Sequence, residues 1–232
     1  MPLLAVWSPK GGSGTSVVAA ACSLVLARTA PARLADLTGD QPAVLGLGTD
    51  PETGLADWLA VGPGAPTEVL ERLAVEIGPD LTLLPVGRGP VPARPADADA
   101  GAALAVALRD GPPTVVDLGT VEGAHRRALL EVADAALIVV RPCYLALRRA
   151  VRLEATRRAT GVVLVEEPGR ALGVREVADV LGRPVVARVP VRDTIARAVD
   201  AGVLPARLPE PLERAARDAL TQVGMLASGA RA

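Results

Sequence analysis

Short apolar runs alternate with longer segments of helical period along the whole chain. The short runs predict buried strands over residues 3–7, 32–35, 81–85, 114–117, 135–140, 161–165 and 184–189. The longer segments predict helices over residues 16–28, 54–60, 67–75, 97–109, 124–133, 145–158, 174–181, 194–201 and 211–225. Strands that alternate with helices form a parallel sheet that is covered on both sides. The pattern therefore predicts an α/β fold, with a doubly wound, mostly parallel sheet and helices on both faces.

The size of the chain favours a single domain. It has 232 residues, of which 50% are hydrophobic, and α/β proteins of this length often fold undivided around one sheet. The Pro- and Gly-rich segment 87–95 is too short for a linker between domains and predicts a surface loop. We therefore expect residues 1–232 to form one domain, with a C-terminal helix over about residues 211–225.

Several function classes are excluded by composition. No apolar run reaches the ~18 residues of a membrane span, and the first strand leads into a glycine-rich loop instead of a cleavage site, so we expect a cytoplasmic protein. Cys22 and Cys143 are too few and too far apart for a disulfide framework or a zinc site. The formal net charge of -1 argues against binding to bulk polyanions but leaves room for a local basic face.

A glycine-rich loop follows the first predicted strand and opens the first predicted helix. It reads Ser8-Pro9-Lys10-Gly11-Gly12-Ser13-Gly14-Thr15-Ser16. In this context backbone N–H groups and the helix N-terminus form a cradle for phosphate. The standard phosphate loop reads G-x-x-x-x-G-K-[ST], so Pro9 stands at its first glycine and Thr15 at its lysine. Lys10 is the only lysine among 25 basic residues, which supports a role that arginine cannot take over.

The loop resembles the deviant Walker A motif, K-G-G-x-G-K-[ST], of the ParA/MinD-type P-loop ATPase family. Further segments are similar to landmarks of that family in the same order: 35–40 to its first switch, 83–87 to its L-P-x-G strand end, 114–119 to its Walker B strand, 133–142 to the A-D strand, and 189–202 to its C-terminal motif. The motif itself is matched at Lys10, Gly11, Gly12, Gly14 and Ser16.

The resemblance implies an ATP and Mg²⁺ site and a homodimer. Lys10 would reach across the dimer to the phosphates bound by the partner. Ser16 would bind Mg²⁺, Asp117 would hold the metal through water, and Asp36 matches the first switch aspartate. The backbone groups that would contact the phosphates are those of Gly11, Gly12, Ser13, Gly14 and Thr15.

Three departures from the family pattern predict weak or absent ATP hydrolysis. Thr15 replaces the lysine that neutralises the phosphates of the same chain. Thr38 stands where the second switch aspartate is expected, and the nearest candidate to replace it is Asp40, two residues further on. Glu166 or Glu167 stands where the family often places an asparagine that contacts adenine.

Three hypotheses of function follow. The first is a spatial-organisation factor of the TadZ/CpaE-like pilus-assembly or septum-site branch, which dimerises with nucleotide and recruits a protein partner at a cell pole, a septum or a secretion machine. The second is a DNA-associated partition ATPase that uses a cluster of arginines. The third is a nucleotide-free scaffold. The cluster comprises Arg141, Arg148, Arg149, Arg152, Arg157 and Arg158.

The remaining signals favour structural roles. The apolar face of helix 211–225 is mostly alanine, so we expect it to pack on the domain, with weak or no membrane association. His125 lies beside two arginines, which predicts an exposed helix residue. The aromatic residues Trp7, Trp58 and Tyr144 are expected to anchor the core or its edge.

Overall fold

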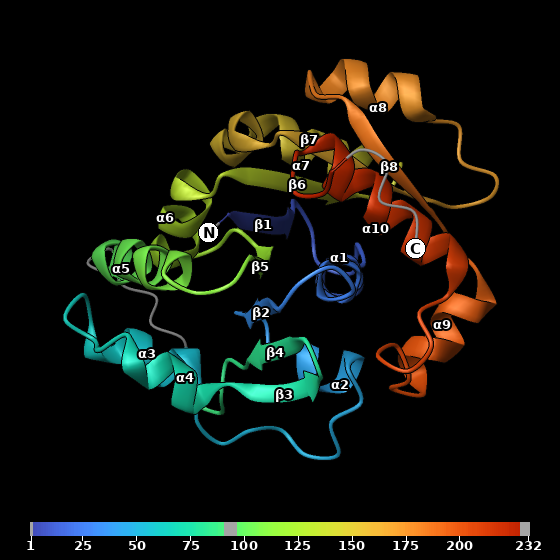
Figure 1. The fold of residues 1–232 in the computed structure, drawn as a ribbon. Helices are drawn as coiled ribbons and strands as arrows, with labels where there is room; N and C mark the ends of the chain where they lie inside the picture. Colours follow the sequence, from blue (N-terminus) through green and yellow to red (C-terminus); the bar gives the residue numbers. More distant parts are fainter. Residues whose placement is uncertain (1, 91–96, 228–232) are drawn as a thin grey trace.

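The computed structural model describes residues 2–90 and 97–227, and its strands form one eight-stranded sheet (Figure 1). The order across the sheet is β3-β4-β2-β5-β1-β6-β7-β8. All neighbouring strands pair in parallel except β3 and β4, which are antiparallel. The strands are β1 (Leu3–Ser8), β2 (Ala32–Asp36), β3 (Val75–Gly78), β4 (Leu81–Leu84), β5 (Thr114–Thr120), β6 (Ala135–Val140), β7 (Gly161–Glu166) and β8 (Val185–Pro190).

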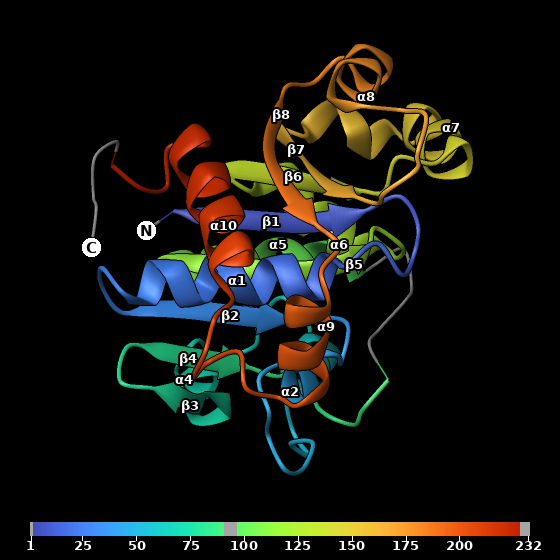
Figure 2. The same cartoon turned by 90° about the vertical axis from the view of Figure 1, so that its right-hand side faces the viewer.

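Helices cover both faces of the sheet, as the sequence predicts (Figures 1 and 2). One face carries α1 (Thr15–Ala27), α2 (Gln41–Val44), α9 (Asp193–Asp200) and α10 (Glu210–Gln222). The other face carries α3 (Leu55–Val61), α4 (Glu68–Leu73), α5 (Asp97–Arg109), α6 (Ala124–Val132), α7 (Tyr144–Arg152) and α8 (Val174–Leu181).

Each central strand contributes to two cores. In β1, Leu4 and Val6 pack under α1, whereas Leu3, Ala5 and Trp7 pack under the helices of the opposite face. Alternate side chains of a strand point to opposite faces, so a strand buried on both sides is apolar throughout. This explains why the sequence shows continuous apolar runs and why Trp7 is fully buried.

Three element assignments from the sequence are wrong in detail. The helix predicted over 67–75 ends at Leu73, and Val75 begins the edge strand β3. The sequence does not reveal this strand, because its four residues alternate between half-buried and exposed positions and are too few to show a clear pattern. The helix predicted over 145–158 stops at Arg152, and a 3₁₀ turn (Glu154–Arg158) follows the extended residue Leu153. The short helix α2 has no counterpart among the predicted elements. Of the loop predicted over 87–95, residues 91–95 lie outside the described residues.

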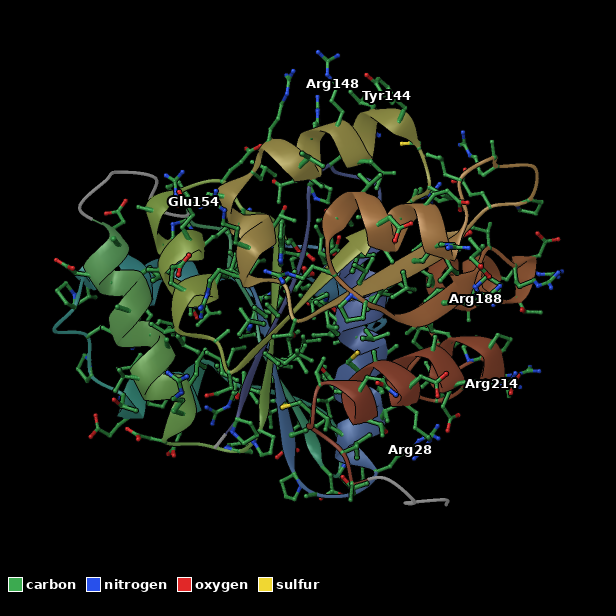
Figure 3. The ribbon with its side chains drawn as sticks, turned by 90° about the horizontal axis from the view of Figure 1, so that it is seen from above. Arg28, Tyr144, Arg148, Glu154, Arg188 and Arg214 are labelled. Carbon is green, nitrogen blue, oxygen red and sulfur yellow. The ribbon has the colours of Figure 1, made fainter. Side chains whose placement is uncertain are left out.

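Two single-residue predictions are also wrong, whereas that for Trp58 is confirmed by its burial. His125 is 3% exposed, because α6 approaches α5 so closely at Gly101 that a Cβ there would lie 2.5 Å from the His125 carbonyl oxygen. Tyr144 is 74% exposed, because the buried side of α7 is formed by Ala146, Leu147 and Ala150. Figure 3 shows Tyr144 at the outer surface of α7.

Helix α10 packs against the sheet and α1, as expected for the C-terminal helix. Its apolar side, which includes Leu212, Ala216 and Leu220, is buried in the same core as α1. Arg28 at the end of α1 forms an ion pair with Glu213 of α10. Within residues 2–90 and 97–227 we find no helix with the length and apolar character needed to cross a membrane.

Candidate functional site

The glycine-rich loop lies where the direction of the chain across the sheet reverses. Strand β1 is the neighbour of both β5 and β6. From β1 the chain passes through α1 to β2 on the β5 side, and it later crosses from β5 to β6 on the other side. In open α/β sheets such a switch point leaves a crevice outside the carboxyl ends of the strands, where ligands bind. The loop occupies that crevice.

The loop has the geometry of an anion cradle. Gly12 and Gly14 have φ angles of 75° and 87°, a region that side chains with a Cβ rarely adopt. The hydroxyls of Ser8 and Ser13 donate to the Lys10 carbonyl over 3.0 and 2.7 Å, and so fix the turn. The backbone N–H groups from residue 11 to residue 16 have no acceptor among the described residues. They are therefore available to a ligand at the N-terminus of α1.

A cavity of about 460 Å³ opens beside the loop. Among the described residues that line it, Arg141 is the one basic side chain and Asp40 the one acidic side chain. Lys10 is half-buried at the edge of the loop and is not part of this lining. The lining includes Gly11, Gly12, Gly14, Thr15 and Ser16 of the loop, Thr38 and Asp40 after β2, Gly119 and Thr120 of β5, and Arg141 after β6.

Asp36 and Asp117 face each other across the pairing of β2 with β5. Both are fully buried. Asp36 Oδ1 accepts hydrogen bonds from the Thr38 N–H and hydroxyl, each over 2.8 Å, and from the Gly39 N–H over 2.9 Å. Burial and the neighbouring Asp117 raise the pKa of Asp36 to about 6. The Asp36 carboxyl group thus holds the segment after β2 and does not line the cavity.

Asp117 is tied to the glycine-rich loop through Gln41. The Gln41 amide nitrogen donates to Asp117 Oδ2 over 2.8 Å and to the Ser16 carbonyl over 3.0 Å. The Gly119 N–H donates to Asp117 Oδ1 over 3.0 Å. Burial raises the pKa of Asp117, and hydrogen bonds from its neighbours oppose that rise. We call Asp36, Asp40 and Asp117 the acidic flank of the cavity.

The acidic flank offers oxygen atoms to a small hard cation. The Ser16 hydroxyl donates to Asp40 Oδ2 over 3.1 Å, so a hydroxyl and a carboxylate already meet at the first turn of α1. No cluster of three or more His, Cys, Asp or Glu side chains suited to a metal occurs in the described part of the chain. Mg²⁺ usually takes only one or two carboxylates and completes its shell with water and phosphate. The residues present therefore fit Mg²⁺ bound together with a phosphate.

The opposite side of the cavity carries an ion-pair network. Arg141 Nη1 lies 2.5 Å from Glu167 Oε1, and Arg170 Nε donates to Glu167 Oε2 over 2.6 Å. These bonds, that from Arg170 first, lower the pKa of Glu167. Glu166 pairs with Arg188 over 2.7 Å. The two carboxylates at the end of β7, Glu166 and Glu167, are thus both engaged by arginines. We call Arg141, Glu167 and Arg170 the basic flank.

Three residues of the site have roles that the sequence does not predict. Gln41 lies in the short helix α2, which the hydrophobic pattern does not reveal. Arg126 of α6 joins the end of β5 to the segment after β2, because it donates to the carbonyls of Thr120 and Leu37. The sequence places Arg141 in the arginine cluster, but β6 pairs with β1, which brings the residue after β6 beside the glycine-rich loop.

Comparisons with known proteins identify the fold. A scan against protein-family models finds no match, and a search of curated proteins finds none. A ParA family ATPase from Chlorobium tepidum is 23% identical with a TM-score of 0.77, covering 94% of this chain and 96% of that chain. MinD from Aquifex aeolicus is 20% identical with a TM-score of 0.79 over 98% of both chains. A variant of Cyanothece McdA in complex with ATP is 17% identical with a TM-score of 0.75 over 97% of both chains. The chain has the ParA/MinD-type P-loop ATPase fold.

Proposed function

From this fold and the geometry of the loop, we propose that the protein binds ATP with Mg²⁺ in the cavity beside residues 8–16. The observation that carries the proposal is the row of backbone N–H groups from residue 11 to residue 16, which have no acceptor among the described residues. A Cβ built on Gly11, Gly12 or Gly14 would meet nothing within 4 Å. A phosphate group can therefore approach the backbone closely from the side of the cavity.

The acidic flank is suited to hold the metal. We assign the Ser16 hydroxyl as a direct ligand and Asp117 as a residue that holds the metal through water. Asp40 accepts a hydrogen bond from Ser16, and its carboxylate is free to turn toward a cation when that bond is replaced. Bound Mg²⁺ would neutralise part of the phosphate charge. Asp36 and Gln41 keep these groups in position through the hydrogen bonds described above.

Turnover is proposed to be slow or absent. Thr15 lines the cavity and is 6% exposed, so its side chain fills the place of the expected lysine without supplying a positive charge. The Thr38 hydroxyl lies 2.8 Å from Asp36 Oδ1 and 3.2 Å from Asp117 Oδ2. A hydroxyl group cannot accept a proton from water as the carboxylate of the expected aspartate would. Asp40 is then the one acidic side chain among the described lining residues that can orient a water molecule.

Nucleotide would favour a homodimer through Lys10. This side chain belongs to the glycine-rich loop but does not line the cavity of its own chain. The position supports the role implied by the family resemblance, in which the ammonium group reaches the phosphates bound by a second copy. Size-exclusion chromatography with light scattering should show a dimer for the wild-type protein with ATP and Mg²⁺, and a monomer for Lys10→Ala under the same conditions.

The cellular role that we propose is spatial organisation at a pole, a septum or a secretion machine, through recruitment of a protein partner. One similar structure, MinD in a MinC:MinD cell division protein complex, supports this choice of role, whereas another, a putative plasmid partition protein, represents the alternative branch. Neighbouring genes would separate the branches: genes for pilins and a secretion ATPase would favour pilus assembly, and a centromere-binding partner would favour partition.

Direct binding tests the proposal. Fluorescent ATP should bind the wild-type protein more tightly with Mg²⁺ than without it, and Thr15→Lys should bind more tightly still. Lys10→Ala should retain binding to the monomer and lose dimerisation. The proposal fails if the wild-type protein shows no binding at millimolar nucleotide, and the nucleotide-free scaffold would then be the better description.

A second candidate function is binding to nonspecific DNA, because several arginines lie exposed on α7 and the turn after it. Arg148, Arg149, Arg152 and Arg157 are all exposed, and Figure 3 shows Arg148 pointing away from the sheet at the outer surface. Binding to phosphates through arginines weakens steeply with salt. Salt-dependent DNA binding that disappears when Arg148, Arg149 and Arg152 are changed to Glu would support this function.

A further inference from the structure

We propose that Arg141 is a phosphate-binding residue, and that its guanidinium supplies, from the segment after β6, the positive charge that a lysine at position 15 would supply from the loop. The inference rests on the proposed function and extends it to a residue outside the recognised motif. Among the described residues that line the cavity, Arg141 is the one basic side chain. Within a single copy of the chain, a triphosphate without Arg141 would rely on backbone dipoles and metal alone.

The position of Arg141 follows from strand pairing. Trp7 of β1 pairs with Ile138 of β6, so the chain segments that follow these two strands leave the sheet side by side. One segment is the glycine-rich loop, and the other begins with Arg141. On the far side of the loop, β5 pairs with β1 and carries Asp117. The loop therefore lies between an acidic flank on its β5 side and a basic flank on its β6 side.

The Arg141 side chain is held in place but not fully satisfied. Its Nη1 group pairs with Glu167, while its Nε–H is buried and finds no hydrogen-bond acceptor among the described residues. Because this Nε–H is closed to solvent, a phosphate would contact the other N–H groups of the guanidinium, which can donate charge-assisted hydrogen bonds. The side chain as a whole is 42% exposed, so a ligand can reach the rest of the guanidinium.

Glu167 acts in this proposal as a positioning residue for Arg141. Its carboxylate is shared between Arg141 and Arg170. Two positive charges share one negative charge, so the network has positive charge left for a ligand. Arg170 does not line the cavity. It forms the same kind of bond to Glu167 and has a similar exposure, 48% against 42%. Arg170 is therefore a matched control for Arg141.

Calorimetric titration of ATP with Mg²⁺ into wild-type protein, Arg141→Gln, Arg141→Lys and Arg170→Gln tests the proposal. Loss of a charge-assisted contact should weaken ATP binding about tenfold to a hundredfold in Arg141→Gln. Arg141→Lys should recover part of that loss, and Arg170→Gln should stay within about threefold of wild type. Adenosine, which has no phosphate, should bind all four proteins equally.

The outcomes separate the two proposals. If Arg141→Gln binds ATP with the same affinity as the wild-type protein, Arg141 does not contact the phosphates, and the proposed nucleotide site remains. A wild-type protein that binds no ATP at millimolar concentration would overturn both. Equal losses in Arg141→Gln and Arg170→Gln, or a loss for adenosine as large as that for ATP, would show that the substitution disturbs structure instead of a phosphate contact. Thermal unfolding of each variant provides the matching measure of stability.

Discussion

The two flanks of the cavity are built in different ways. On the acidic flank, Asp36 and Asp117 are fully buried and their oxygens accept hydrogen bonds from backbone and side chains of three chain segments. On the basic flank, Arg141 and Arg170 are about half exposed and share a single carboxylate. Asp36 and Asp117 therefore belong to the folded core, whereas Asp40, Arg141 and Arg170 lie at or near the surface of the site.

The difference indicates which parts of the site can change without loss of the fold. Groups of the acidic flank hold together the ends of β2 and β5 and the start of α1, so substitutions there should act on stability first. On the basic flank, the substitution that should act on ligand affinity first is that of Arg141, which lines the cavity. The loop between them keeps its backbone geometry even though Thr15 and Thr38 depart from the family pattern, because that geometry depends on glycines and serines.

The largest expected difference between the flanks is in the free energy of unfolding, when the carboxylate of Asp36 on the acidic flank and that of Glu167 on the basic flank are removed in turn. Asp36→Ala leaves the part-buried N–H groups of Thr38 and Gly39 and the buried N–H group of Gln41 without this acceptor, and should lower the free energy of unfolding by about 3 kcal/mol. Glu167→Ala removes two ion pairs whose arginines are about half exposed and should lower the free energy of unfolding by less than about 1 kcal/mol. Urea unfolding of both variants measures this. Similar losses in the two variants would contradict the distinction between the flanks.

A smaller loss of stability is expected at Gln41. Gln41→Ala removes the amide that donates to Asp117 and to the Ser16 carbonyl, and should cost about 2 kcal/mol in urea unfolding. Arg188→Gln, which breaks the exposed pair with Glu166, is the control and should change stability by less than about 1 kcal/mol. If Gln41→Ala were as stable as the control, Gln41 would not join the acidic flank to the loop.

Two of the three serines of the loop, Ser13 and Ser16, separate metal binding from loop structure. Ser16→Ala removes the proposed metal ligand and should reduce the gain in ATP affinity on addition of Mg²⁺ by about tenfold, or ~1.4 kcal/mol. Ser13 bonds to the Lys10 carbonyl and does not line the cavity, so Ser13→Ala should keep the full gain. Titrations with Mg²⁺ and with EDTA measure both. A gain that Ser16→Ala leaves intact would remove Ser16 from the metal site.

The smallest effects are expected from two glycines that differ in backbone conformation. Gly14→Ala places a Cβ at a φ of 87° and should destabilise the protein by about 1 kcal/mol. Gly11 has no positive φ, and a Cβ on it would point into open space, so Gly11→Ala should keep its stability but lower ATP affinity by narrowing the cradle. Thermal unfolding and ATP titration of both variants check this. An unchanged affinity in Gly11→Ala would argue that phosphate does not approach that side of the loop.

The sequence predicts the part of the site that is continuous in the chain. Strand, glycine-rich loop and helix follow one another, so local pattern suffices to identify residues 8–16 and the parallel sheet. The roles of Arg141 and Gln41 could not be predicted, because they depend on which strands are neighbours and on how the segment after β2 turns back. The burial of His125 could not be predicted either, because it depends on the close approach of α5, at Gly101, to α6. Contacts between distant segments carry no local signal.

The most direct test of the account is a double-mutant cycle between position 15, where a lysine can be restored, and Arg141, which is proposed to supply the positive charge instead. ATP affinity would be measured for the wild-type protein, Thr15→Lys, Arg141→Gln and the double variant, in the presence of Mg²⁺. If Arg141 takes over the function of the missing lysine, Thr15→Lys should improve affinity at least about tenfold more in the Arg141→Gln background than in the wild-type background. Equal improvement in both backgrounds would show that the two positions act independently and would contradict the account.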